Sequence, residues 1–488
     1  MKSGTKTKIL AAFILAATAT TALAQHQSSH FCSIDTVKIK KNHLRTALVT
    51  QGINLGLWTY DRHISGSEFA KINIKTVRSN METGFVWDSD RLATNHLGHP
   101  LNGGFYHSAA RANGLTYWEA LPYSVAGSLV WEVFAEKEPP GLNDFIATPL
   151  AGAAFGEVSH RISGLILDNN ATGADRIGRE LAAFAINPIG SVNRLFTGQS
   201  WKVREEQTIP IPVSMEVSSG LRYVADGGVL SGGGTTPYLR FGMEYGYKAD
   251  AAWDAPFDYF RLGFTMNPMG DNVSQPLFGR VDITGRIWGS DIDTGSQSTD
   301  ALWGIFQQYD YYHYRAGKEG GINSLFNFSE TVAAGVGLVL EHRGSKAALT
   351  QDFFADLIVL GAVQNKNLFI IERHYNMGSG LAVKSRTSLR LLDRISLSLD
   401  MKVFYINTWK DKDYRLLEED THPLYYNTPG DKSRSLAYVL EPSVRIDITR
   451  HWGVYASAAR LALDSIFTHF PTDKARTTDI LLGLCYNL

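Results

Sequence analysis

A two-residue hydrophobic period constrains this chain more than any other feature, and it runs from near Trp201 to Leu488. Apolar residues alternate there with small or charged residues in one segment after another. The clearest segments are residues 213–223, 239–248, 260–266 and 395–403. Because successive side chains of a strand point to opposite faces, each segment predicts a strand with one apolar face and one mixed face.

The length of these runs favours a membrane barrel over a soluble sandwich. They exceed the roughly five or six residues of an ordinary strand and approach the roughly nine to eleven that cross a bilayer. A sandwich would have shorter strands with the polar face outside. Turn-forming clusters such as Asp226-Gly227-Gly228 and Pro429-Gly430-Asp431 separate about twelve segments, and residues 478–488 suit a closing strand. The sequence therefore predicts an antiparallel transmembrane β-barrel of about 12 strands.

Composition agrees with this prediction and excludes one class of partner. The 45 glycines and 11% aromatic residues suit a protein with many turns and aromatic girdles. The formal net charge of −1 argues against nucleic acid, because a nucleic-acid binder needs a basic excess to meet phosphates. Cys32 and Cys485 are too few for a disulfide framework, although one bridge between them is open to the chain in an oxidising compartment.

The first residues have the pattern of a secretory signal peptide, predicted for residues 1–24. Lys2, Lys6 and Lys8 precede the apolar run of residues 9–24, and Ala22-Leu23-Ala24 has the small-x-small form of a cleavage site. Residues 25–44 are polar and basic and are expected to be a flexible lead-in. Export to the bacterial outer membrane follows, with outer-membrane lipid and the barrel-assembly machinery as expected partners.

Residues 45–200 have a helical rather than a two-residue period. Helices are expected over residues 44–63, 116–135, 145–167 and 175–186. Asn143 or Asp144 is the expected N-cap of the third, after Pro139-Pro140-Gly141. In that helix Gly152 and Gly156 form a small face that another helix can approach closely.

The predicted fold is therefore α+β, with an N-terminal helical module over residues 45–200 and the barrel over residues 201–488. The module is expected to act as a lumen plug or as a periplasmic cap.

The helical module also has a family resemblance. The residues that carry it are Gly52-Ile53-Asn54, Tyr60-Asp61-Arg62, Asn95, His99-Pro100, Ala110-Arg111, Trp118-Glu119, Trp131-Glu132, Glu138-Pro139-Pro140, Asn143-Asp144, Gly156-Glu157 and Asn187-Pro188. Over residues 50 to 200 the chain resembles an uncharacterised bacterial domain-of-unknown-function family of exported, envelope-associated proteins. The resemblance implies an outer-membrane setting and brings no established activity.

Each motif in this module has a functional and a structural interpretation. His96-x-x-His99 could hold a metal with Glu119, Glu132, Asp144 or Glu157, but Pro100 also suits histidines that pack at a helix end.

Glu157-x-x-His160 is half of a di-iron signature, which needs two copies, and only one is present, so an internal salt bridge with Arg161 is the favoured explanation. His107-Ser108 and Ser128 could suggest a hydrolase, but serines among small residues usually pack.

Charged residues within apolar helices are the best functional lead. Buried charges are costly unless they are paired, so they indicate either a polar network or a site. The candidate members of this cluster are Arg111, Glu119, Glu132, Asn143, Asp144, Glu157, His160 and Arg161.

Two functions remain open. One is an outer-membrane barrel, not an enzyme, that serves envelope integrity, lipid handling or passage of a small solute. The other is a barrel-embedded hydrolase or acyltransferase acting on lipid through His96 or His99 and a carboxylate from the same set. No metal or other cofactor is expected.

Overall fold

The computed structural model describes residues 31–33, 39–203, 209–228, 233–250, 255–268, 277–314, 326–364, 366–367, 373–409 and 427–488. The chain divides into two compact units. The helical unit runs to Asp88 and then from Leu97 to Val213, and the barrel unit contains Ser89–His96 and Ser214–Leu488. The predicted signal peptide (1–24), most of the lead-in and the side chain of Cys32 lie outside the described residues.

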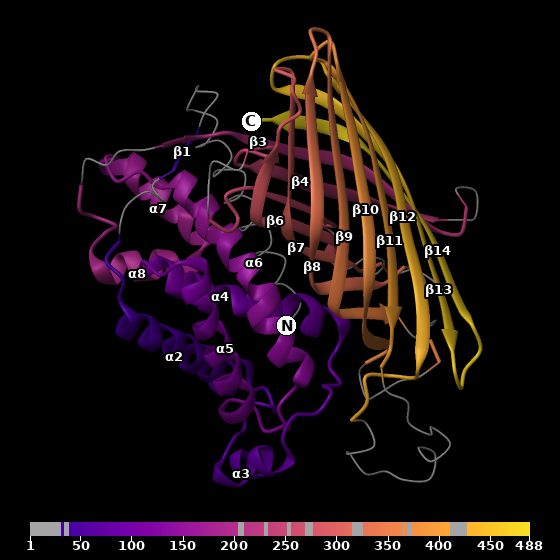
Figure 1. Ribbon diagram of the computed structural model, residues 1–488. Helices are drawn as coiled ribbons and strands as arrows, with labels where there is room; N and C mark the ends of the chain where they lie inside the picture. The colour runs from indigo at the N-terminus through magenta and orange to yellow at the C-terminus, as the bar shows by residue number, and fades with distance from the viewer. Residues whose placement is uncertain are drawn as a thin grey trace. The chain divides into compact units, whose positions relative to one another are not determined.

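The helical unit consists of α-helices, two short π-helical segments and one small sheet, all marked in indigo to magenta in Figure 1. Its elements are β1 (Phe31–Ser33), α2 (His43–Thr59), η2 (Tyr60–Ser65), α3 (Ile74–Thr83), η3 (Thr94–Gly98), α4 (His99–Ala112), α5 (Tyr117–Phe134), α6 (Leu142–Ile166), α7 (Gly173–Ile186), α8 (Pro188–Thr197) and β2 (Ile209–Ile211). Strand β1 pairs antiparallel with β2, and η3 continues from the barrel unit into α4. None of the helices in the described part of the chain is both long and apolar enough to cross a bilayer.

Local signals in the sequence set the helix ends. The Thr116 side chain accepts a hydrogen bond from the Glu119 backbone N–H, and the Glu119 carboxylate accepts one from the Thr116 N–H, so a capping box begins α5. The predicted N-cap of α6 is corrected, because the helix begins at Leu142 with Gly141 as its N-cap. Gly141 has the extended backbone that precedes a helix, which leaves Asp144 in the first turn, where the helix dipole favours a carboxylate.

In the described residues of the barrel unit, twelve antiparallel strands close into a barrel. They are β3 (Val213–Asp226), β4 (Gly233–Tyr245), β5 (Phe260–Met266), β6 (Phe278–Ile292), β7 (Thr299–Tyr312), β8 (Phe328–Arg343), β9 (Ala347–Gln364), β10 (Tyr375–Leu391), β11 (Ile395–Asn407), β12 (Ser433–Asp447), β13 (Trp452–Phe467) and β14 (Asp473–Asn487). Each strand pairs with its neighbours in the chain, and β14 pairs with β3 to complete the ring. The predicted fold, N-terminal helices followed by a barrel of about 12 strands, is confirmed.

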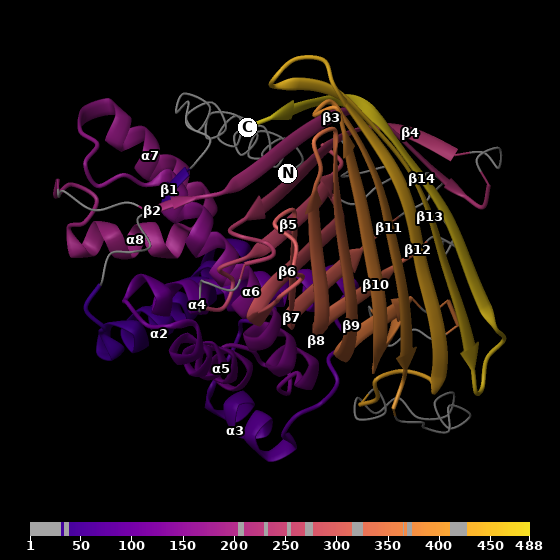
Figure 2. The same ribbon diagram turned by 45° about the horizontal axis from the view of Figure 1, so that its top comes forward.

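The alternation that predicted the strands also sets their two faces. Along β11, Met401, Val403 and Tyr405 are 40%, 45% and 40% exposed, whereas Lys402 and Phe404 between them are buried. The exposed residues therefore face outward and the buried ones face the lumen. Figure 2 shows β7 to β12 side by side in the wall that carries this pattern.

Part of the outer wall is covered by the chain itself. Tyr309 precedes the inward-facing Asp310 on β7, so it points outward, yet it is only 1% exposed. The segment Ser89–His96 covers it, because the Tyr309 hydroxyl donates to the His96 carbonyl over 2.5 Å. His96 Nδ1 lies 2.6 Å from the hydroxyl of Thr331, and Asn95 donates to the Tyr375 hydroxyl over 2.9 Å. This segment is thus a packed part of the barrel unit.

Candidate functional site

The helical unit is organised around the crossing of α4 on α6, where glycines let the two backbones touch. A Cβ on Gly103 would lie 1.6 Å from the Thr148 carbonyl oxygen, and one on Gly152 would lie 2.6 Å from Gly103 Cα. A Cβ on Gly156 would lie 2.7 Å from the Gly104 carbonyl oxygen. The predicted close approach of another helix to Gly152 and Gly156 is confirmed, and α4 is that helix.

This crossing brings three basic side chains around the fully buried carboxylate of Glu157, which we call the Glu157 group. Arg111 on α4 donates from Nε to Oε2 over 2.7 Å and from Nη2 to Oε1 over 3.2 Å. Arg161, one turn further along α6, donates from Nε to Oε1 over 2.9 Å, as its spacing predicted. His107 Nε2 lies 3.0 Å from Oε2.

The electrostatics of the Glu157 group favour one protonation state. Burial alone would raise the pKa of the Glu157 carboxyl, but the charges of Arg111 and Arg161 hold that pKa well below its usual range. Burial lowers the pKa of His107 against the opposing effect of Glu157. At neutral pH the carboxylate is therefore ionised and the imidazole is neutral, with its proton on Nε2 toward Glu157. A carboxylate with this many donors is suited to holding two helices together.

A second set of polar side chains, the His99 group, lies at the ends of three helices. It comprises His99 at the start of α4, Glu132 near the end of α5 and Asp144 in the first turn of α6. One ligand atom from each of the three lies within 4.8 Å of the others. The side chains of Glu132 and Asp144 are buried, and burial lowers the pKa of His99 to about 4, so its imidazole is neutral. These are the described residues that could hold a metal.

Hydrogen bonds orient each member of the His99 group. The Gly141 N–H donates to Glu132 Oε2 over 2.9 Å, and the Asn143 side chain donates to Asp144 Oδ1 over 2.7 Å. The Thr148 hydroxyl lies 3.3 Å from His99 Nδ1. Asn143, a predicted member of the polar cluster, thus belongs to this group through its hydrogen bond to Asp144.

The remaining predicted residues lie elsewhere. The Glu119 side chain is 35% exposed and accepts a hydrogen bond from Lys41 over 2.8 Å, which with the Thr116 cap lowers its pKa to about 2. The half-buried His160 follows Glu157 by one helical turn. The single predicted cluster is corrected to two groups with Glu119 outside both, because Glu119 completes the capping box of α5.

The two histidines of His96-x-x-His99 belong to different units. His96 lies in the π-helical segment η3 and packs on the barrel wall, whereas His99 begins α4. Ser108 accompanies His107 on α4, and its hydroxyl donates to the Gly156 carbonyl over 3.3 Å. This contact agrees with the packing interpretation of that serine.

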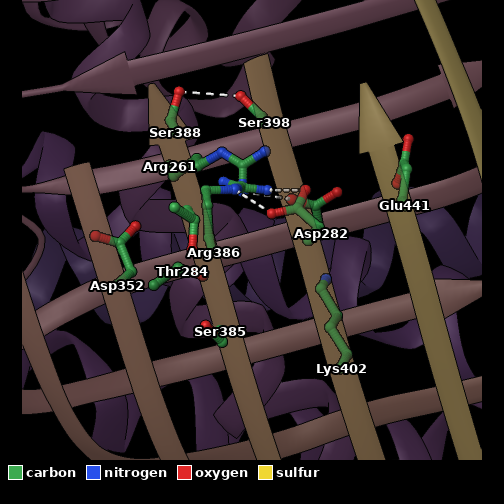
Figure 3. Close-up of polar contacts among 12 residues, drawn as sticks. Arg261, Asp282, Thr284, Asp352, Ser385, Arg386, Ser388, Ser398, Lys402 and Glu441 are labelled. Atoms are coloured by element: carbon green, nitrogen blue, oxygen red, sulfur yellow. Dashed lines mark hydrogen bonds and ion pairs between the residues drawn. The ribbon is translucent and has the colours of Figure 1, made fainter. Parts of the chain in front are cut away.

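The barrel lumen holds a further polar site, which sequence reasoning missed. Arg280 on β6 donates to the Glu441 carboxylate on β12, and these strands lie opposite each other in the ring order. Lys402 on β11 donates to Asp310 on β7 over 2.5 Å, four strands away. Figure 3 shows Lys402 and Glu441 on one layer of strands, with Arg261 and Asp282 on the strands that cross behind it. Ion pairs therefore span the lumen.

Lys384 is at the centre of this lumen site. Its ammonium donates to Glu330, lies 2.9 Å from Asp310 Oδ2 and lies 3.5 Å from Asp356 Oδ2. All four side chains are almost fully buried. One strand of the wall, β9, lies between Lys384 on β10 and Glu330 on β8, so the ammonium links strands that are not direct neighbours.

Little free space remains at this level of the lumen. A cavity of about 30 Å³ lies among the charged side chains, room for roughly one or two water molecules. Its lining includes Arg261, Asp282, Arg386, Asp400 and Lys402. The Arg386 guanidinium forms a two-point ion pair with Asp400, and Ser388 and Ser398 are joined by a hydrogen bond of 2.9 Å above it (Figure 3).

An apolar layer follows the charged layer along the lumen. Inward side chains from many strands form one buried cluster, which includes Tyr312, Phe328, Ile358, Phe404 and Leu461. The two layers meet where Lys384 lies 5.6 Å from the ring centroid of Phe404 and Arg280 lies 5.3 Å from that of Tyr312. The lumen is therefore a packed interior in this conformation.

The comparisons with known proteins match part of the chain to an uncharacterised domain. Residues 84–189 match the family described as a domain of unknown function (DUF3943), so the predicted resemblance to such a family is confirmed over these residues. No curated protein matches the chain.

Among solved structures, the barrel is similar to the NanC porin, with 8% identity, 56% of this chain and 100% of that chain covered, and a TM-score of 0.28. It is also similar to OmpT, an outer membrane protein of Vibrio cholerae, with 7% identity, coverage of 57% and 97%, and a TM-score of 0.24. An anion-selective porin from Comamonas acidovorans matches with 9% identity, coverage of 57% and 99%, and a TM-score of 0.24.

Proposed function

We propose that the protein is an integral β-barrel of the bacterial outer membrane whose lumen passes small polar solutes. The observation that carries the proposal is the division of side chains between the two faces of the wall. Large apolar residues such as Leu357, Leu381 and Val403 are exposed outside, whereas charged residues of both signs lie inside. A closed barrel with an apolar outside suits a bilayer, and ionised groups inside suit polar solutes.

The connections between strands agree with an outer-membrane orientation. At one end of the barrel most turns are short, such as those from β8 to β9 and from β10 to β11, and the longer connection from Tyr245 of β4 to Phe260 of β5 is the exception. At the other end the connections from β7 to β8 and from β11 to β12 are much longer. Outer-membrane barrels have short periplasmic turns and longer extracellular loops, so the short turns mark the proposed periplasmic side.

The ion pairs across the lumen supply a gate in this proposal. The contact between Arg280 and Glu441 joins opposite walls, and the Lys384 contacts fill the space beside it. A solute passes only when these pairs separate. A solute with hydrogen-bonding or charged groups can replace part of the lost interactions, whereas an apolar one cannot.

Liposome swelling tests the proposal. The full chain is reconstituted as wild type, as Glu441→Ala and as Asp393→Asn, where Asp393 is a highly exposed turn residue. We expect slow swelling in a small sugar for the wild type and for Asp393→Asn, and several-fold faster swelling for Glu441→Ala. Equal swelling of all three folded proteins, at the rate of protein-free liposomes, would contradict solute passage.

The finer predictions stay predictions. They include the plug or cap role of the helical module, removal of residues 1–24, handling by the barrel-assembly machinery, envelope or lipid roles, and lipid-acting catalysis with His96 or His99. Separate measurements on the exported protein test each of them.

A further inference from the structure

Three donor side chains from three helices converge in the His99 group. His99 belongs to α4, Glu132 to α5 and Asp144 to α6, and their ligand atoms lie within 4.8 Å of one another. His99 Nε2 lies 3.7 Å from Asp144 Oδ1. That separation is too long for a hydrogen bond and near the roughly 3.4 Å that separates two ligands of a tetrahedral ion with bonds of about 2.1 Å.

Hydrogen bonds hold each donor side chain in place. Thr148 is next to His99 Nδ1, which leaves Nε2 on the side of Asp144. Gly141 fixes Glu132 through Oε2, and Asn143 fixes Asp144 through Oδ1. Hydrogen-bond partners that set the orientation of a ligand side chain are a regular feature of protein metal sites.

The backbone also makes room for this arrangement. A Cβ on Gly141 would lie 2.2 Å from Asp144 Oδ2, so a larger residue there would push the carboxylate out of place. The position of Asp144 in the first turn of α6 stabilises its ionised form through the helix dipole.

The charge and chemistry of the donors select the ion. Two carboxylates supply a charge of −2 when they are deprotonated on metal binding, which a divalent cation neutralises. One nitrogen and two oxygen donors suit Zn²⁺ or Mn²⁺ better than thiolate-preferring ions, and three protein ligands leave a position for water.

We propose that His99, Glu132 and Asp144 form a binding site for one divalent transition-metal ion, with Zn²⁺ as the ion to test first. The three residues belong to the helical unit, so the proposal goes beyond solute passage through the barrel and does not depend on it.

Metal uptake by the purified full-length protein tests the proposal. Untagged protein in detergent is stripped with a chelator, dialysed against Zn²⁺ and analysed for bound metal, and its affinity is measured by competition with a fluorescent chelator. We expect about one equivalent in the wild type. Glu132→Gln and Asp144→Asn should weaken binding by more than the roughly 10- to 100-fold that loss of an outer partner costs, and Thr148→Val by about that factor.

Matched controls separate a site from adventitious or unfolded binding. Glu82→Gln removes an exposed carboxylate of α3 and should leave uptake unchanged. Circular dichroism of each variant reports whether the helices persist. If Asp144→Asn fails to fold, the visible absorption of wild-type protein loaded with Co²⁺ still reports the site. Less than a tenth of an equivalent in the wild type, or unchanged affinity in both folded carboxylate variants, would overturn the proposal.

Discussion

The two units solve the same problem, a buried charge, in different ways. In the helical unit, Glu157 meets Arg161 on its own helix and Arg111 on a helix that glycines bring into backbone contact. In the barrel, Arg280 meets Glu441 across the lumen, with 160 residues of chain between them. The helical network therefore depends on one close crossing, whereas the barrel network depends on the register of the whole ring.

The largest loss of stability is expected from a substitution that breaks the ion pairs of Glu157 in the helical unit. Glu157→Gln leaves Arg111 and Arg161 without the carboxylate between them, and we expect it to lower the free energy of unfolding of the helical unit by about 3–5 kcal/mol. Denaturation followed by circular dichroism at 222 nm measures this. Glu82→Gln, an exposed partner of Arg78, is the control and should change little. A loss below about 1 kcal/mol for Glu157→Gln would show that the group does not hold the crossing.

The next effect concerns the two faces of the barrel. Leu399 points outward on β11, and Ser398 points into the lumen, where it meets Ser388. Leu399→Arg places a charge in the bilayer and should cost about 2–4 kcal/mol near the midplane. Ser398→Arg should cost less, because its charge lies among other charged groups. Urea midpoints of the folded barrels compare the two, and equal losses would mean that the faces are assigned incorrectly.

A smaller change in stability should distinguish glycines in backbone contact with another helix from glycines with open space around them. Gly103→Ala forces a Cβ into the Thr148 carbonyl, and we expect a loss of about 1–3 kcal/mol from the helical unit. Gly178 on α7 has open space around it, so Gly178→Ala should instead stabilise by roughly 0.5–1 kcal/mol. The two changes should thus have opposite signs in the same thermal melt. If both variants change stability in the same direction, the crossing of α4 on α6 is not the contact that organises the helical unit.

The smallest effect is a pH dependence of the stability of the helical unit. The folded-state pKa values of His107 and Glu157 are both lowered, so the unfolded chain binds more protons in acid. Stability is full above pH 6.5, begins to fall below it through His107 and His99, and falls further below pH 4.5 through Glu157. His107→Gln should reduce the first part of this loss. A helical unit that gains stability between pH 7 and pH 5 would contradict the assignment.

How far the sequence predicted the molecule depends on the range of each contact. Strand faces and the pair of Glu157 with Arg161 follow from local periods, so they were predicted. The glycines of α6 were predicted to form a contact face. Their partner, Gly103-Gly104 on α4, was not predicted, because the sequence does not show which two glycine-containing segments meet. Glu119 was expected inside, although Thr116-x-x-Glu119 is itself a capping-box pattern and could have placed it at the helix end.

The lumen network could not be predicted in the same way. Arg280, Lys384 and Glu441 each read as an ordinary inward residue of an alternating strand. Which of them meet depends on the tilt and stagger of the closed ring, and a shift of one strand would change every partner. The His99 group likewise depends on how three helix ends meet in the tertiary structure. The sequence identified His99, Glu132 and Asp144 as candidate residues but not that they lie together.

The central claim is that ion pairs across the lumen control passage, and a charge exchange at one pair tests it most directly. Conductance of the reconstituted full chain in planar bilayers is measured for wild type, Arg280→Glu, Glu441→Arg and the double variant with both changes. Each single variant places like charges together across the lumen and should raise conductance several-fold. The double variant restores an opposite pair and should return conductance toward the wild-type value. Additive increases in the double variant, or no conductance in any folded variant, would contradict the account.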